Sequence, residues 1–238
     1  MSEIACVTGL RNRPYRHTRK FFESLCHQTI PIDIVVVDYG GTPMHLGWER
    51  RMFDHPNVKL VEVIRGTEIW NEARSLNIGI KTAITPYIFA VNADIIFCEN
   101  YAESIVDVLK NNPNVLVTSR RIDLDIKGRP TTAFMPEYYY GTCIAARREL
   151  FYDLHGFDET YVASFLDTDF VGRARDCEFK VVNISDRTAC FHQYHKNYTN
   201  IRSQDEQKAF DEAYLVGQEH SRVLNKPRVR NPNGWGEL

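Results

Sequence analysis

The sequence lacks the patterns of a membrane-spanning or disulfide-linked secreted protein. No apolar run approaches the roughly 18 residues that would suggest a transmembrane helix. The first residues show no charged stretch followed by a long apolar one, so we expect no signal peptide. None of the 6 cysteines lies in a CxxC pair, which argues against a zinc site or a disulfide framework and favours reduced thiols. A cytoplasmic location is therefore expected.

The sequence also has little excess charge and no familiar phosphate-binding loop. The formal net charge is -2, which gives no argument for a nucleic-acid or membrane partner. Two stretches, "RNRPYRHTRK" (11–20) and "KPRVR" (226–230), are basic and could face either phosphate or solvent. Neither a Walker loop nor a GxGxxG fingerprint occurs, so a P-loop or dinucleotide-binding protein is not indicated.

Strand-like and helix-like segments alternate along the chain. The run "IDIVVVD" (32–38) is typical of a strand covered on both faces, and "WNEARSLNIGIKTAI" (70–84) has apolar residues near helical spacing. The alternation predicts an α/β fold with a mainly parallel central sheet flanked by helices. We expect strands at 4–9, 32–38, 58–64, 87–97, 114–120, 180–185 and 187–195, and helices at 17–28, 70–84, 102–112, 147–156, 167–177 and 203–224.

Polar residues follow three of the predicted strands, at 8–11, 38–42 and 92–94. Ligands of such sheets bind beyond the carboxyl ends of the strands, so these segments are expected to share a site. The stretch "FAVNADIIF" (89–97) is unusual because Asp94 stands inside an apolar run. A buried carboxylate without a partner is costly, so a positive group is expected beside it; a turn or capping role is the alternative.

The second half of the chain holds further candidates. Asp167 and Asp169 begin a predicted helix, where position alone suits them to act as helix N-caps. "CFHQYH" contains His192 and His195, and a lone histidine is more often a surface or core residue than a ligand. The aromatic run 138–140 could stack on a sugar ring or a base, or simply pack a loop.

Four segments, taken in order, resemble the GT-A glycosyltransferases, most closely the family 2 type, with some similarity to galactosyl- and N-acetylgalactosaminyltransferases. They are "ACVTGLRNRP", "IVVVDYGGT", "NEARSLNIGIKTAITPYIFAVNADIIF" and "GFDETYVASFLDTDFVGRAR". The resemblance covers roughly residues 4–195 and implies a Rossmann-like GT-A fold with a small C-terminal acceptor-side portion. It implies a single domain over 1–238, with a nucleotide-sugar-binding half (1–120), an acceptor and catalytic half (121–200), and a C-terminal helix and tail (201–238).

The resemblance also implies roles for residues that match the family's motifs. "NAD" occupies the family's DxD position with Asn92 in place of the first acid, so Asp94 is expected to be the main carboxylate beside Mn²⁺ (or Mg²⁺). His192 is the expected late metal ligand, with His195 as the alternative or as a phosphate contact. The residues expected to bind the nucleotide sugar are Thr8, Arg11, Asp38, Arg74, Asn77, Asn92, Gly141 and Thr142.

The segment "GFDETYVASFLDTDF" (156–170) is similar to the part of the family that supplies the catalytic acid. Asp167 falls on the position that serves as general base in inverting members, and Asp169 is the second candidate. Leu166 stands where a further acid is usual, and Ser75 departs from the family's "ARN.G" pattern. Both departures leave the assignment of roles open to test.

The predicted activity is transfer of a sugar from a UDP-sugar donor to an acceptor hydroxyl, with inversion and with a divalent metal. One alternative is a sugar-1-phosphate nucleotidyltransferase, although "TGLRNRP" has a single glycine where those enzymes carry a glycine-rich loop. Another is a non-catalytic nucleotide- or carbohydrate-binding module, which the Asn92 and Leu166 departures would suit. The acceptor stays open among a glycan, a lipid-linked sugar, a protein, a small molecule and modified DNA.

Overall fold

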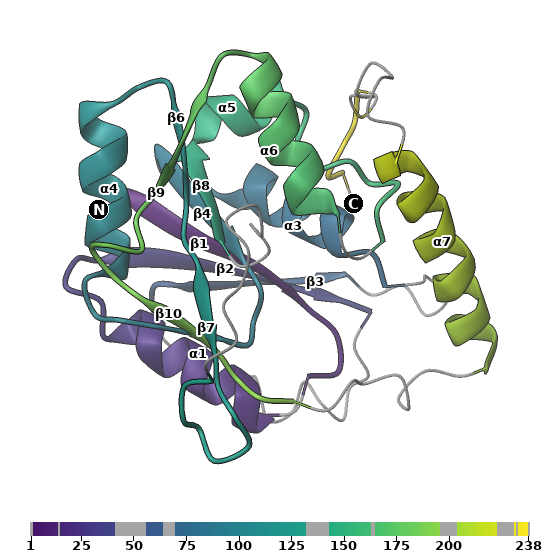
Figure 1. Ribbon diagram of the computed structural model, residues 1–238, viewed down its shortest axis with the longest axis horizontal. Coiled ribbons are helices and arrows are strands. Elements are labelled where there is room, and N and C mark those ends of the chain that lie inside the picture. The colour runs from purple at the N-terminus through teal and green to yellow at the C-terminus, as the bar shows by residue number, and fades with distance from the viewer. Residues whose placement is uncertain are drawn as a thin grey trace.

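The protein is described here from a computed structural model, which covers residues 2–13, 15–40, 56–63, 70–131, 143–162, 165–195, 204–222, 231 and 233–237. Its main sheet has seven strands in the order β3-β2-β1-β4-β8-β6-β9 (Figure 1). These strands are β1 (Ile4–Leu10), β2 (Ile32–Tyr39), β3 (Val58–Val63), β4 (Tyr87–Val91), β6 (Val115–Thr118), β8 (Cys143–Arg147) and β9 (Lys180–Asn183).

The main sheet is mostly parallel, which confirms the predicted α/β fold class. β1 pairs in parallel with β2 and β4, β2 with β3, and β6 with β9. β8 runs antiparallel between β4 and β6. We did not predict β8, because its short sequence "CIAAR" runs directly into helix-forming residues. Since β8 and β9 pair with strands of the first 120 residues, the proposed two halves share one sheet.

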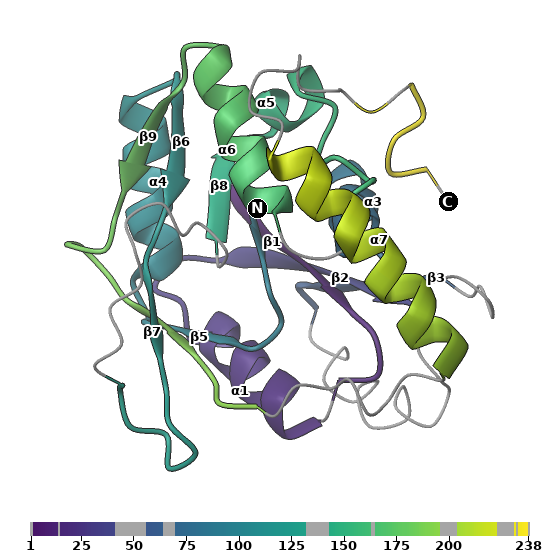
Figure 2. The same ribbon diagram turned by 45° about the vertical axis from the view of Figure 1, so that its right-hand side comes forward.

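Helices cover both faces of the main sheet (Figures 1 and 2). Alternate residues of β1 serve the two faces: Ile4 and Cys6 belong to one buried cluster, and Ala5 and Val7 to the other. The first cluster includes side chains of α1 (Tyr15–Cys26) and α4 (Tyr101–Asn111). The second includes those of α3 (Glu72–Thr82), α5 (Arg148–Asp153) and α6 (Leu166–Asp176).

A separate three-stranded sheet lies beside α1, in the order β5-β10-β7 (Figure 2). Its strands are β5 (Ile95–Phe97), β10 (Cys190–His192) and β7 (Arg121–Asp123). The prediction of one strand over 87–97 was therefore wrong: β4 ends at Val91, and the chain turns before β5 enters the second sheet. The turn is closed by a hydrogen bond from the Ile95 amide to the Asn92 carbonyl, 3.3 Å long.

The last described helix is α7 (Gln204–Arg222), near α3 and the start of α6 (Figures 1 and 2). The Tyr214 ring lies 6.0 Å from that of Phe165, centroid to centroid. Within the ranges given above, every helix is too short or too polar to cross a bilayer.

Candidate active site

Asp94 lies in the turn between β4, which belongs to the main sheet, and β5, which belongs to the small sheet. Its side chain is only 3% exposed. The Gln193 amide donates to the Asp94 carbonyl at 3.0 Å, and the Gln193 side-chain amide donates to it at 3.3 Å. The backbone just after β10 therefore holds Asp94 in place, which explains how residues a hundred positions apart meet.

The Asp94 carboxylate has positive and imidazole groups on one side. Arg13 forms an ion pair with its Oδ2. The Nε2 atoms of His195 and His192 lie 3.1 Å and 3.6 Å from the same oxygen. Its other oxygen, Oδ1, is buried and has no hydrogen-bond partner among the described residues. We call Arg13, Asp94, His192 and His195 the strand-end cluster.

The electrostatics of this cluster keep Asp94 ionised. Burial alone would raise its pKa, but the Arg13 guanidinium and the neighbouring imidazoles of His192 and His195 outweigh that effect. The pKa of Asp94 is consequently held well below its ordinary value. The chain itself therefore supplies part of the positive charge that the sequence predicted beside Asp94.

The cluster fits a divalent cation. One carboxylate oxygen of Asp94 and one ring nitrogen each of His192 and His195 all lie within 4.8 Å of one another. The unpartnered Oδ1 of Asp94 gives a buried acceptor that needs a positive partner. One oxygen and two imidazole ligands suit Mn²⁺ better than Mg²⁺, which prefers oxygen ligands alone.

Two more acids, Glu72 and Asp167, have displaced pKa values, and Glu72 senses the charge of Asp94. Burial raises the pKa of Glu72 to about 7, with the charges of Asp94 and Asp167 adding to the rise and Arg13 opposing it. Burial also raises the pKa of Asp167, against hydrogen bonds from backbone amides and the charge of Arg121. Such displaced values are common where a site must hold or move a proton.

Local structure explains where these acids stand. Glu72 is the first residue of α3, and its amide donates to the Val162 carbonyl at 2.9 Å, which ties α3 to the segment before α6. Asp167 lies in the first turn of α6, two residues after Phe165, which has a left-handed conformation (φ 63°). Both carboxylates therefore sit at helix N-termini, where the helix dipole favours negative charge.

The predicted nucleotide-binding residues of the first two strands lie at the carboxyl end of the sheet. Thr8 and Asp38 are buried near the ends of β1 and β2, and Asp38 pairs with Leu10 in the strand register. Arg11 follows β1 and is half-buried. Asn92 is half-buried in the turn that carries Asp94. Their predicted contacts with a nucleotide stay predictions.

Asn77 has a structural place instead. It is fully buried in α3, and its side-chain amide donates to the Phe157 carbonyl at 2.8 Å and to Glu159 Oε1 at 2.9 Å. Its Oδ1 accepts from the Phe157 amide at 2.8 Å. The polar atoms of Asn77 therefore hold the segment before α6, and its predicted contact with a nucleotide stays a prediction.

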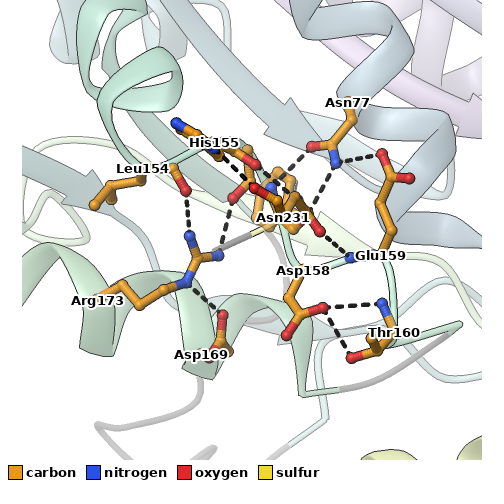
Figure 3. Close-up of polar contacts among 11 residues, drawn as sticks. Asn77, Leu154, His155, Asp158, Glu159, Thr160, Asp169, Arg173 and Asn231 are labelled. Atoms are coloured by element: carbon orange, nitrogen blue, oxygen red, sulfur yellow. Dashed lines mark hydrogen bonds and ion pairs between the residues drawn. The ribbon is translucent and has the colours of Figure 1, made fainter. Parts of the chain in front are cut away.

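Asp169 likewise serves the fold. It pairs with Arg173 Nε at 2.7 Å, and Arg173 donates to the carbonyls of Leu154 (2.6 Å) and Gly156 (2.9 Å) (Figure 3). Of the two roles considered for Asp169, the structure supports that of a structural acid. Asn231 completes the network, donating to the carbonyls of His155 and Phe157. We call Asn77, Asp169, Arg173 and Asn231 the loop clamp.

The other predicted binding residues are divided between the described and undescribed parts of the chain. Arg74 is half-buried, and its Nη2 lies 3.5 Å from the Glu237 carbonyl of the tail. Gly141, Thr142 and the tyrosines 138–140 lie outside the described residues.

Three residues near Asp94 were missed at the level of sequence: Arg13, Glu72 and Asp123. Arg13 lies in the basic stretch 11–20, which gave a general signal for phosphate but none for a specific partner. Glu72 and Asp123 gave none, because a single acid at a helix start or in a presumed loop is common. Asp123 meets His192 only because β7 and β10 pair.

The chain matches the model of glycosyl transferase family 2 over residues 8–170. It belongs to that family. The match spans both the strand-end cluster's Arg13 and Asp94 and the acid-bearing start of α6. Among curated proteins, no sequence matches significantly.

Solved glycosyltransferases share the fold at low identity. S. aureus TarS 1–349 in complex with UDP-GlcNAc has a TM-score of 0.68 and 15% identity, over 94% of this chain and 67% of that one. The mannosyltransferase PcManGT from Pyrobaculum calidifontis, in complex with GDP-Man and Mn²⁺, has a TM-score of 0.66 and 16% identity, over 94% and 76%. The chain spans 66% of TarS 1–349 in its UDP complex.

Proposed function

We propose that this protein transfers a sugar from a UDP-sugar to an acceptor hydroxyl, with inversion at the anomeric carbon and with a divalent metal. The observation that carries the proposal is the convergence of Asp94, His192 and His195, with a buried Asp94 oxygen that has no hydrogen-bond partner among the described residues. Family 2 membership supports the reaction class. The galactosyl or N-acetylgalactosaminyl subtype stays a prediction.

Asp94, His192 and His195 would hold the cation, with Mn²⁺ favoured over Mg²⁺ by the two imidazoles. When bound, a divalent cation neutralises the negative charge that develops on the leaving diphosphate. Arg13 stands beside Asp94 and would add a second positive group for the same phosphates.

Asp167 would act as the general base. Its carboxylate would take the proton of the acceptor hydroxyl while that oxygen forms a bond to the anomeric carbon. The bond from that carbon to the diphosphate oxygen breaks at the same time, and UDP leaves with the electron pair. The raised pKa of Asp167 suits this role, because a stronger base accepts the proton more readily.

The donor's base and sugar would lie along the carboxyl ends of β1, β2 and β4, beside Thr8, Arg11, Asp38 and Asn92. UDP is favoured by the TarS complexes, and GDP is the competitor because PcManGT was solved with GDP-Man. The proposal leaves the acceptor open.

A metal-independent transferase is the second candidate, favoured by the ion pair between Arg13 and Asp94. In that reaction Arg13 and the histidines would supply all of the positive charge for the diphosphate. Dependence on Mn²⁺ separates the two candidates, since only the first requires the cation for turnover.

The test is UDP release from a panel of UDP-sugars, measured with Mn²⁺ and with EDTA, on the wild type and Asp94→Asn. We expect activity that requires Mn²⁺ and falls roughly 10²–10³-fold in the variant, the range seen when a charge-stabilising group is lost. Asp107→Asn, an exposed acid on α4, is the charge-matched control. Equal release by Asp94→Asn and wild type would contradict the proposal, and full activity in EDTA would favour the metal-independent candidate.

A further inference from the structure

His192 has a second carboxylate on the side of its ring away from Asp94. His192 Nδ1 lies 2.9 Å from Asp123 Oδ1. An ionised carboxylate can only accept, so the hydrogen bond requires the proton on Nδ1. This leaves the other ring nitrogen, Nε2, 3.6 Å from Asp94 Oδ2 and free of its proton in the neutral ring.

The small sheet fixes this arrangement through its backbone. In the parallel pairing of β10 with β7, His192 stands opposite Asp123, so both side chains leave the same face of the sheet. The Leu124 amide donates to the His192 carbonyl at 2.9 Å. On the other side, β10 pairs with β5 so that His192 stands opposite Ile95, the residue after Asp94. Three segments distant in sequence are thus held in one register.

Asp123 also forms an ion pair with Arg121, through the same oxygen that His192 contacts. Arg121 Nε lies 3.0 Å from Asp123 Oδ1, and the Arg121 side chain is only 12% exposed. Because Arg121 and Asp123 are two residues apart on one strand, they share a face of the sheet. A continuous row of charged and polar groups therefore leads to the proposed cation, in the order Arg121, Asp123, His192 and Asp94.

We infer that Asp123 is a positioning residue of the metal site: it fixes the tautomer and the orientation of His192, so that Nε2 faces the ion. The inference rests on the proposed function, because it assigns no role to Asp123 without a metal at Asp94. A carboxylate behind a histidine ligand also increases the ligand's basicity, and loss of such a partner typically weakens metal binding 10–100-fold. The competing view is that Asp123 serves only as the ion-pair partner of Arg121.

The test measures binding of Mn²⁺ alone, by the loss of the free-ion EPR signal, with folding checked by circular dichroism and urea unfolding. We expect Asp123→Ala to weaken Mn²⁺ binding roughly 10–100-fold and Asp123→Glu to recover part of that loss. Asp186→Ala, which removes an exposed acid shortly before β10, is the matched control and should bind as the wild type does. Unchanged Mn²⁺ affinity in folded Asp123→Ala would overturn the inference.

A double-mutant comparison separates positioning from a general electrostatic effect. If Asp123 acts through His192, Asp123→Ala should cost no further Mn²⁺ affinity in a His192→Ala background. In a His195→Ala background, Asp123→Ala should still weaken Mn²⁺ binding by most of the factor seen in the wild type. Equal losses in both backgrounds would overturn the inference, because they would show that Asp123 acts on the ion without His192.

A measurement on the wild type covers the case in which Asp123→Ala does not fold. The ¹⁵N shifts of the His192 ring in metal-free protein, at a pH where the ring is neutral, report which nitrogen carries the proton. We expect the Nδ1–H tautomer, and the Nε2–H tautomer would overturn the inference. Absence of Mn²⁺ binding by the wild type would defeat the proposed metal and this inference together, whereas wild-type binding without an Asp123 effect would defeat the inference alone.

Discussion

The loop clamp and the strand-end cluster are both polar and largely buried, yet they are completed differently. In the loop clamp, Asn77 and Arg173 find carbonyl and carboxylate partners within the chain, as Figure 3 shows. In the strand-end cluster, Asp94 has three partners gathered on one oxygen, and its other oxygen has no hydrogen-bond partner in the described part of the chain.

This difference distinguishes buried polar groups that stabilise the fold from those that we expect to bind a ligand. Buried polar groups whose donors and acceptors match one another stabilise a particular loop conformation. A buried group with an unmatched acceptor, beside imidazoles and further acids, is costly unless a ligand satisfies it. Such a cost is reasonable where a ligand supplies the missing charge, so we expect changes in the two regions to affect different measurements.

The largest effect on kcat should follow a change at Asp167, the proposed general base in the first turn of α6. We expect Asp167→Asn to lower kcat roughly 10²–10⁴-fold, because the amide cannot take the acceptor's proton. Mn²⁺ affinity should stay close to the wild-type value, since Asp167 lies outside the proposed ligand set. UDP release in the presence of an acceptor gives kcat, and Asp176→Asn, an exposed acid at the other end of α6, is the control. A variant that keeps wild-type kcat would exclude Asp167 as the base.

The second-largest effect should follow a change at Arg173 and should appear only in the free energy of unfolding. Arg173→Met removes the hydrogen bonds to Leu154 and Gly156 and leaves the Asp169 carboxylate, only 10% exposed, without its ion-pair partner. Breaking such a buried pair from one side typically costs about 3–5 kcal/mol, measurable by urea unfolding. Exposed Arg175→Met in the same helix is the comparison. If Arg173→Met kept its stability but lost Mn²⁺ affinity, the division between the two regions would be wrong.

The sequence predicted the main sheet well because its strands are continuous apolar runs whose pattern depends on local residues. β2 and α3 follow such patterns directly. The meeting of Asp94 with His192 was also predicted, but only through the family resemblance. The small sheet was not predicted, because strands of three residues carry almost no periodic signal and its pairing joins distant segments.

The hydrogen-bond partners of two predicted site residues could not be predicted for a related reason. Asn77 and Asp169 match the positions of functional motifs, but their roles depend on whether the chain itself supplies a partner. For Asn77 that partner is the backbone of residue 157, eighty positions away. A sequence pattern gives the residue type and its place on an element, whereas the hydrogen-bond balance appears only in three dimensions.

Glu72 gives the smallest and most diagnostic effect, because it adds to the negative charge around Asp94. Its pKa is about 7 in the folded protein and is expected near 4.5 in the unfolded chain. The folded state therefore binds the proton more tightly, and the stability that this contributes is present below about pH 4.5 and is lost as the pH rises through about 7. In metal-free protein, Glu72→Gln should escape that loss and exceed the wild type by roughly 1–3 kcal/mol at pH 8.

The advantage of Glu72→Gln should shrink toward pH 5, where Glu72 of the wild type is protonated. Urea unfolding of both proteins at several pH values in EDTA measures the difference, and Glu149→Gln, in the first turn of α5, controls for loss of an acid at a helix start. Added Mn²⁺ should reduce the advantage at pH 8, because the cation favours the ionised form of Glu72, which is unfavourable in metal-free protein. If the difference in unfolding free energy between Glu72→Gln and the wild type did not depend on pH, the ionisation of Glu72 would not be its cause. Glu72 would then not belong to the charge imbalance that distinguishes the strand-end cluster from the loop clamp.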